Sequence, residues 1–364
     1  MLRKSPNPAN ADSAGRRASV SVVLAVGCAA LTLLAVLAVS LGPLRIPILD
    51  VWQIFALKLG VLDAGDLTTR DINVVWMLRV PRVIMGAMVG AALAISGAAL
   101  QSLFNNPLAD PGIVGVTSGA SVGAVGAIVL SAAFENTWLF QKLGTQWMVP
   151  MGAFLAGLAI TLLVYALARP KRNRGTARML LVGIALGSSC QAVVGFFTYI
   201  ANDSELQTLV FWQMGSLSKV TWLQVTVVLP VFLVGVTCMA FLSRALDVLT
   251  LGERQAQHLG LNVAKARLLV ILATAMLTAA AVAFAGSIGF VGLVVPHILR
   301  FIVGPLHRSL LPASAIAGAA LLVAADTASR IIAPPTEIPI GLFTALVGAP
   351  FFLFLVLREK RGTW

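Results

Sequence analysis

Charged side chains are scarce in this sequence. Asp, Glu, Lys and Arg together make up 11% of the 364 residues, whereas an ordinary soluble domain carries roughly 25%. Hydrophobic residues make up 59% of the chain. A soluble globular fold is excluded by this composition, because there is too little polar surface to cover so many apolar residues.

Residues that hold metals or phosphates are also few. The three cysteines lie far apart in apolar stretches, and the three histidines form no His-Glu-x-x-His pattern, which argues against a catalytic metal site. The chain has no Gly-x-x-x-x-Gly-Lys-Ser/Thr phosphate loop, nor any Gly-Lys pair. We therefore expect no bound metal, no cofactor and no ATP site of that kind in this chain.

Carboxylates are missing from the middle of the apolar stretches. Secondary transporters usually place such groups within the membrane, whereas Asp110, Asp326 and Glu337 lie at the ends of predicted spans or in loops. An ion-coupled carrier is thus disfavoured but stays open as an alternative, as does a membrane-bound enzyme. A many-spanned protein without its own energy source suggests a subunit that a partner drives.

Long apolar runs fill the chain instead, most of them near the roughly 20 residues that cross a ~30 Å hydrocarbon core as a helix. The runs cover residues 20–41, 83–104, 111–134, 148–168, 179–201, 220–243, 268–299, 309–325 and 338–357. Run 268–299 would make ~48 Å of helix, so we expect it to fold back near Gly286, Gly289 and Gly292. The sequence predicts an all-α polytopic membrane protein with ten transmembrane helices.

The basic residues give the orientation. With the N-terminus in the cytoplasm and ten spans, 18 of the 26 Lys and Arg residues fall on the cytoplasmic side, as the positive-inside rule requires. Both termini are then cytoplasmic, with tails at 1–19 and 358–364 around a single domain at 20–357. We read the first run as a retained span, since it exceeds a signal-peptide core and no clear cleavage site follows it.

Small residues recur at helical spacing in two places. Gly86, Gly90 and Gly97 share one face of the second span, and the tetrapeptide Gly-Ala-Ala-Leu begins at 90, 97 and 318. Gly119 and Gly123 follow Gly115 at intervals of four residues at the start of the third span. Such faces let helices approach closely in a membrane.

The longest cytoplasmic connection, residues 244–267, mixes charge with leucines. Thr250 and Glu253 have the spacing of a capping box, and Gly260 is placed to end the short helix that would follow. A helix of about two turns is marginal alone. We expect it either to dock onto a partner or to lie on the membrane surface.

Several stretches resemble one known family over about residues 20–360. They are Leu78-Arg-Val-Pro-Arg82, "NNPLADPGIVGVTSGASVG" from Asn105, the Leu-Gly pairs at 251–252 and 259–260, "GFVGLVVPHILR" from Gly289 and "EIPIGLFTALVGAPFF" from Glu337. Together they resemble the FecCD-type permeases of bacterial ABC importers, which take up iron-siderophores, haem and vitamin B12.

This resemblance implies a type II ABC importer permease fold in the bacterial inner membrane. It implies a homodimer around one central pathway, two ATP-binding cassette subunits and an extracytoplasmic substrate-binding protein, with ATP and Mg²⁺ on the ATPase. No nucleic acid is implied. The stretch "SELQTLVFWQMGSLSKVTW" from Ser204 looks most like the haem branch, so haem is favoured over a siderophore, with cobalamin third.

The resemblance also assigns roles to single residues. It implies that Arg79, Arg82 and Arg330 at the outer surface dock the binding protein. It implies that Gly252, Glu253, Arg254 and Leu259 couple the chain to the ATPase. It implies that Asn106, Leu108 and Thr176 form the cytoplasmic gate. The chain departs from the family pattern at Ala177, where the family can have a hydroxyl residue. The pathway-lining candidates are Gln191, Phe196, Phe197, Tyr199 and Met214.

Overall fold

The computed structural model describes residues 19–63, 65, 67–131, 137–138, 144–168, 175–334 and 336–359. Within these ranges every regular element is a helix, so the predicted all-α class is confirmed. Most of the two predicted cytoplasmic tails, and residues 169–174 with four of the basic residues, lie outside the described residues.

Ten apolar helices form the bundle in the described part of the chain. They are α1 (Val20–Ser40), α4 (Val80–Leu103), α5 (Val116–Val129), α8 (Thr145–Leu167), α9 (Gly175–Ile200), α11 (Trp222–Leu249), α13 (Val263–Ala285), α14 (Val291–Val303), α15 (His307–Ile332) and α16 (Ile340–Glu359). By length and composition seven of them, counting the continuous helix Thr69–Leu103 as one, can cross a membrane, and the apolar stretches in α5, α14 and α16 are shorter. The ten crossings that the sequence predicts therefore stay a prediction, with seven of the helices long enough by themselves.

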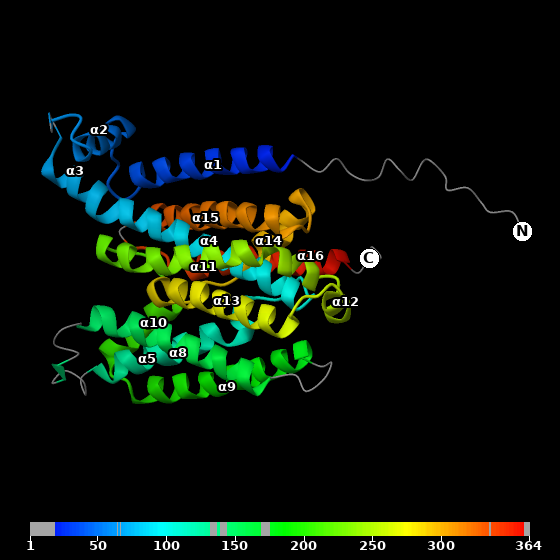
Figure 1. Cartoon of the computed structure of the whole chain (residues 1–364). Helices are drawn as coiled ribbons and strands as arrows, with labels where there is room; N and C mark the ends of the chain where they lie inside the picture. Colours follow the sequence, from blue (N-terminus) through cyan, green and yellow to red (C-terminus); the bar gives the residue numbers. More distant parts are fainter. Residues whose placement is uncertain are drawn as a thin grey trace, which may run out of the picture.

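Short helices cap the two ends of the bundle. They are α2 (Ile48–Lys58), α3 (Thr69–Asn73), η2 (Val74–Arg79), η3 (Pro111–Val114), α10 (Asp203–Met214) and α12 (Glu253–His258). Figure 1 shows α2, α3 and α10 at one end and α12 at the other, where α1 begins and α16 ends. We call these the α2 end and the α12 end. Successive apolar helices alternate in direction. The start of α1 and the end of α16 therefore lie at the same end of the bundle, as an even number of crossings requires.

Local sequence accounts for several helix starts. Asn202 and Glu205 form a capping box at the start of α10, and the Asn262 side chain accepts a hydrogen bond from the Lys265 N–H at the start of α13. Each pairing satisfies an amide that the first turn of a helix leaves without a partner.

Helix α4 lies at the centre of the bundle and almost all of its residues are buried. Of the three glycines on its predicted packing face, Gly86 faces the Leu217 side chain, and Gly90 and Gly97 meet the backbones of two neighbours. A Cβ on Gly90 would lie 2.2 Å from the Gly318 carbonyl oxygen of α15. One on Gly97 would lie 1.7 Å from the Gly292 carbonyl oxygen of α14. Close helix packing through small residues is confirmed, and two of the three Gly-Ala-Ala-Leu tetrapeptides begin at residues that touch each other.

The glycines of the third apolar stretch pack against α8. A Cβ on Gly123 would lie 2.0 Å from the Gly152 carbonyl oxygen, and one on Gly119 would lie 2.7 Å from the Ala156 carbonyl oxygen. Gly115 precedes α5 and has a φ of 84°, a conformation that favours glycine. The predicted face is confirmed, with α8 as the partner.

The long run 268–299 breaks where its glycines are. Helix α13 ends at Ala285, Gly286 follows with a φ of 72°, and α14 begins at Val291. A side chain on Gly286 would meet the Trp212 carbonyl oxygen at 2.2 Å. The predicted fold-back is confirmed.

The predicted end of the eighth apolar run, 309–325, is wrong. Helix α15 continues to Ile332, so Asp326 and Arg330 lie inside the helix rather than at its end or in a loop. These two charged residues, which we expected beyond the end of the span, form an ion pair. Arg330 Nε lies 3.3 Å from Asp326 Oδ2. Paired charges of opposite sign are tolerated within such a helix.

We predict that Gly97→Ala destabilises the protein, because the added methyl group has no room beside Gly292. Overpacking of this kind costs about 1–3 kcal/mol or more. Gly195→Ala in α9 is the matched control, since a Cβ there has no atom within 4 Å. Thermal unfolding in lipid nanodiscs should show a lower midpoint for the first variant alone, and equal midpoints would contradict the packing described.

Candidate functional site

The predicted coupling segment forms a short helix between two left-handed glycines. Gly252, with a φ of 99°, precedes α12, and Gly260, with a φ of 82°, follows it. Gly260 therefore ends the helix as predicted. The capping box at Thr250 is wrong: α11 continues to Leu249, and the Thr250 hydroxyl donates to the Asp247 carbonyl oxygen at 2.6 Å.

Helix α12 is fixed on one side and exposed on the other. Ala256 is fully buried, and Glu253 forms an ion pair with Arg267 of α13. Leu251 and Leu259 are 58% and 64% exposed. Glu253 is thus engaged within the chain, whereas the leucines at either end of α12 face outward.

The predicted gate residues lie in the turn that follows α4. The Asn106 side chain accepts a hydrogen bond from the Leu108 N–H at 2.9 Å, and the Asn106 carbonyl accepts from the Ala109 N–H at 3.1 Å. Asn105 has a φ of 46°, in the left-handed region that asparagine tolerates. The turn is held by its own bonds while Leu108 stays exposed. Thr176 lies in the first turn of α9, and its side chain is outside the described residues.

A buried polar network lies between this turn and α12. Asp247 Oδ1 lies 2.6 Å from His307 Nδ1, and His307 Nε2 lies 2.7 Å from the Ser102 hydroxyl oxygen. Arg300 Nη2 donates to the same hydroxyl at 2.7 Å. With its proton on Nδ1, His307 donates to Asp247 and accepts from Ser102, so both ring nitrogens have a partner.

The network joins four helices at the α12 end. Ser102 is in the last turn of α4, Arg300 in α14, and His307 is the first residue of α15. Asp247 is in the last turn of α11, five residues before Gly252. Sequence reasoning missed these contacts, because it treated Arg300 as a topology signal and His307 as an isolated histidine.

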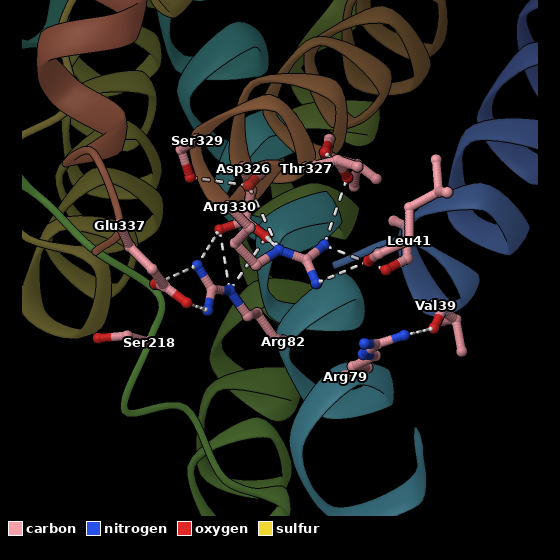
Figure 2. A network of polar contacts seen from close by, with 12 residues as sticks. Val39, Leu41, Arg79, Arg82, Ser218, Asp326, Thr327, Ser329, Arg330 and Glu337 are labelled. Carbon is pink, nitrogen blue, oxygen red and sulfur yellow. Dashed lines mark hydrogen bonds and ion pairs between the residues drawn. The ribbon is translucent and has the colours of Figure 1, made fainter. Parts of the chain in front are cut away.

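A second polar cluster lies at the α2 end (Figure 2). The Arg82 guanidinium donates to Asp326, with Nε at 2.9 Å from Oδ1, and to Glu337, with Nη1 at 3.0 Å from Oε1. Two carboxylates from distant parts of the sequence thus share one arginine. Such forked contacts fix both distance and orientation.

The other two arginines bind backbone carbonyls at or just beyond the end of α1. Arg79 donates to Val39 at 2.6 Å and to Ser40 at 2.8 Å, and Arg330 donates to the Ala38 carbonyl at 3.1 Å. Figure 2 shows the two side chains approaching α1 from different helices. They satisfy carbonyl groups at the end of α1 that have no partner within the helix.

These contacts bury all three arginines that were expected at the outer surface. Arg79, Arg82 and Arg330 are 5%, 8% and 3% exposed. Docking of an acidic partner needs accessible guanidinium groups, so that role stays a prediction. The structure places them in an internal cluster that connects α1, α4, α15 and Glu337.

The helix geometry beside the cluster is unusual. Residues Val74–Arg79 form a π-helical turn, and the Val80 N–H donates to the Val75 carbonyl, five residues back. Pro81 follows, which has no N–H to donate. The extra residue in this turn sets the positions of Arg79 and Arg82, and π turns are frequent at functional sites.

A cleft of about 590 Å³ lies between α5 and α9. Most of its polar lining consists of hydroxyl and amide groups: Thr117, Ser118, Ser121, Ser188, Gln191, Gln213 and Ser287. Asp110 adds a carboxyl group. Burial raises the pKa of that carboxyl above its ordinary value, opposed by a hydrogen bond from the Gly112 N–H. The cleft therefore offers many hydrogen-bonding groups and little fixed charge.

Only one of the five pathway-lining candidates, Gln191, lines this cleft. Phe196 and Tyr199 are exposed on α9. Phe197 packs toward Gly126 of α5, and Met214 is partly buried at the end of α10. The five expected residues are thus spread over four environments.

Comparison with known proteins gives consistent matches. A model of the FecCD transport family matches residues 30–358. The hemin transport system permease protein HmuU of Yersinia pestis is 42% identical over 309 residues, covering 84% of this chain and 90% of that protein. The cobalamin import system permease protein BtuC of Halobacterium salinarum is 41% identical over 355 residues, covering 98% and 90%.

A solved structure agrees with these matches. It is described as an inward-facing conformation of a metal-chelate type ABC transporter, and it superposes with a TM-score of 0.79 at 32% sequence identity. The match covers 93% of this chain and 99% of that one. The arrangement of helices therefore extends over nearly the whole length of both.

We predict that Asp326→Asn destabilises the protein, because Arg82 and Arg330 lose a buried negative partner. Removing one member of a buried ion pair costs about 3–5 kcal/mol. Asp203→Asn is the control, since Asp203 is exposed in the first turn of α10 and should change stability by less than about 1 kcal/mol. Thermal unfolding measures both, and a similar small effect at the two positions would argue against the cluster.

Proposed function

The chain belongs to the FecCD transport family of ABC permeases, and from that premise we propose that it carries a metal-bearing tetrapyrrole inward, with haem as the first candidate. The observation that supports this class is the pair of relatives at 42% and 41% identity, named for hemin and for cobalamin. Both ligands are large macrocycles around a metal. A ferric siderophore is the alternative substrate, and an ion-coupled carrier is a more distant one.

The energy for transport comes, in this proposal, from a separate ATPase. The exposed side of α12, with Leu251 and Leu259, is the surface that would meet it. Its other side is fixed by Ala256 and by the Glu253–Arg267 pair. A movement received there would reach α11 and α13 directly, because they flank α12 in the chain.

The substrate pathway lies, we propose, along the cleft between α5 and α9. A second copy of the chain would supply the facing wall and cover the exposed apolar residues of α9, among them Leu181, Ile184 and Phe196. Hydroxyl and amide groups of the cleft would hold water or the polar edge of the substrate without binding it tightly. The turn at Asn106 and Leu108 would close the pathway at the α12 end.

The cycle then follows alternating access. A binding protein delivers the substrate at the α2 end, and closure of the ATPase subunits switches the pathway through α12. This chain makes and breaks no covalent bond. It positions the substrate, excludes it from the lipid and opens to one side at a time.

The test is uptake into proteoliposomes that contain the purified permease, its ATPase and its binding protein. We expect haem to accumulate only when ATP is present, and unlabelled ferric siderophore to compete poorly. Uptake driven by a proton gradient without the ATPase would contradict the proposal and favour a secondary carrier. Preferential uptake of siderophore would overturn the tetrapyrrole assignment.

One variant tests the role of α12 in the same assay. Leu259→Asp should reduce ATP-driven uptake at least about tenfold, because an unpaired charge would have to be buried against the ATPase. Leu306→Asp is the control, since Leu306 is a leucine at the same end of the bundle, 62% exposed, and outside α12. Loss of uptake in both variants would remove the specific role of α12.

A further inference from the structure

A second cavity shares no lining residue with the α5–α9 cleft. It has a volume of about 550 Å³ and lies between α11 and α15, with Ile95 of α4 among its lining residues. Its walls are mainly apolar: Val236 and Met239 from α11, and Leu311, Pro312 and Ala315 from α15. We call this cavity the α11–α15 groove.

Two arginines stand at the α12 end of the groove. Arg244 lies near the end of α11 and Arg308 is the second residue of α15, and both line the cavity and are exposed. Neither has a hydrogen bond or an ion pair to another residue in the part of the chain that the structure describes. This distinguishes them from Arg79, Arg82, Arg267, Arg300 and Arg330, which are all bonded within the chain.

The dimensions fit one leaflet of a bilayer. From Arg244 back to Val236 the helix rises about 12 Å, and the hydrocarbon of one leaflet is about 15 Å thick. The outer rim of the groove carries Phe241, which is 84% exposed, as a residue facing lipid is. With the α12 end at the membrane surface, the apolar part would lie at the depth of acyl chains and the arginines at the depth of headgroups.

We propose that the α11–α15 groove binds an anionic phospholipid. The phosphate is held between Arg244 and Arg308, whose guanidinium groups suit the tetrahedral oxygens of a phosphate. One acyl chain lies along Val236, Met239, Leu311 and Ala315. Basic pockets between transmembrane helices on the cytoplasmic side commonly bind anionic headgroups, and two unpaired positive charges favour such a lipid over a zwitterionic one.

The groove is also well placed to stabilise the α12 end. His307, which lines the cavity, is the first residue of α15 and bonds to Asp247 of α11. A lipid that bridges Arg244 and Arg308 would therefore connect α11 to α15 a second time, on the surface side of that bond. The proposal depends on the membrane location of the chain and not on the identity of the transported substrate.

The experiment uses the purified full-length chain in detergent, with dioleoylphosphatidylglycerol or dioleoylphosphatidylcholine added. Native mass spectrometry counts the bound lipids, and thermal unfolding gives the shift of the midpoint. We expect phosphatidylglycerol to bind more tightly and to raise the midpoint. Inorganic phosphate at the same concentration should do neither, because it lacks the acyl chain.

Two variants remove different parts of the site. The double variant Arg244→Gln/Arg308→Gln should weaken binding by about tenfold for each charge-assisted hydrogen bond that it removes. Ala240→Trp keeps both charges but fills the groove from its exposed side, and should also abolish lipid binding. Arg178→Gln is the matched control, since Arg178 is an exposed arginine at the start of α9 and lies outside the groove.

Three results would overturn the proposal. They are equal binding of the two lipids by the unaltered chain, undiminished phosphatidylglycerol binding by both groove variants, and a weakening in Arg178→Gln as large as in the double variant. The last would indicate general attraction of anionic lipid to the basic end of the protein.

Discussion

The antiparallel contact between α4 and α15 is the constraint on which the rest of the structure depends. The two helices are joined at three levels, near both ends and at the middle. The pairs are Arg82 with Asp326, Gly90 with Gly318, and Ser102 with His307. Within a bilayer, apolar surfaces alone do not drive helices together. Close backbone contact and buried polar bonds supply the attraction instead, and this pair has both.

The α4–α15 pair contacts different helices at the two ends of the molecule. At the α2 end, Arg79 and Arg330 bind the last carbonyls of α1 and the residues that follow, so the first helix is attached to the central pair. At the α12 end, Asp247 connects α11 to His307, close to both the turn after α4 and the short helix α12. In our proposal an ATPase acts on α12. The network is then a physical connection to the central pair from α11, the helix that directly precedes α12.

The sequence predicted the features that depend on local pattern. Glycine spacing predicted the packing faces of α4 and α5, and clustered glycines predicted the break after Ala285. The sequence pattern could not predict that Asp326 lies inside a helix. The rule that charged residues mark the end of a span fails when the charge has a buried partner. Asp247 and His307 are 60 residues apart, and nothing local indicates that they meet. Thr250 failed as a cap because tertiary packing of α11 extends that helix to the preceding residue.

The site was predictable to a similar degree. The sequence predicted a short helix that ends at Gly260, and the structure has α12 there with Gly260 after it. The sequence did not predict the burial of Arg79, Arg82 and Arg330, because arginines near the end of an apolar run suggest the membrane surface. Their partners are two carboxylates, Asp326 in α15 and Glu337 before α16, and backbone carbonyls at the end of α1. Only the assembled bundle brings these groups near the arginines.

The central claim is that the α12 end faces the cytoplasm, since an ATPase can act on α12 only there. The direct measurement is labelling of single cysteines by a membrane-impermeant maleimide in right-side-out vesicles, with Cys28, Cys190 and Cys238 replaced by serine. Leu259→Cys and Val61→Cys report the two ends, and both native side chains are exposed. We predict labelling at position 61 alone until the vesicles are opened. Labelling at position 259 in sealed vesicles would contradict the account.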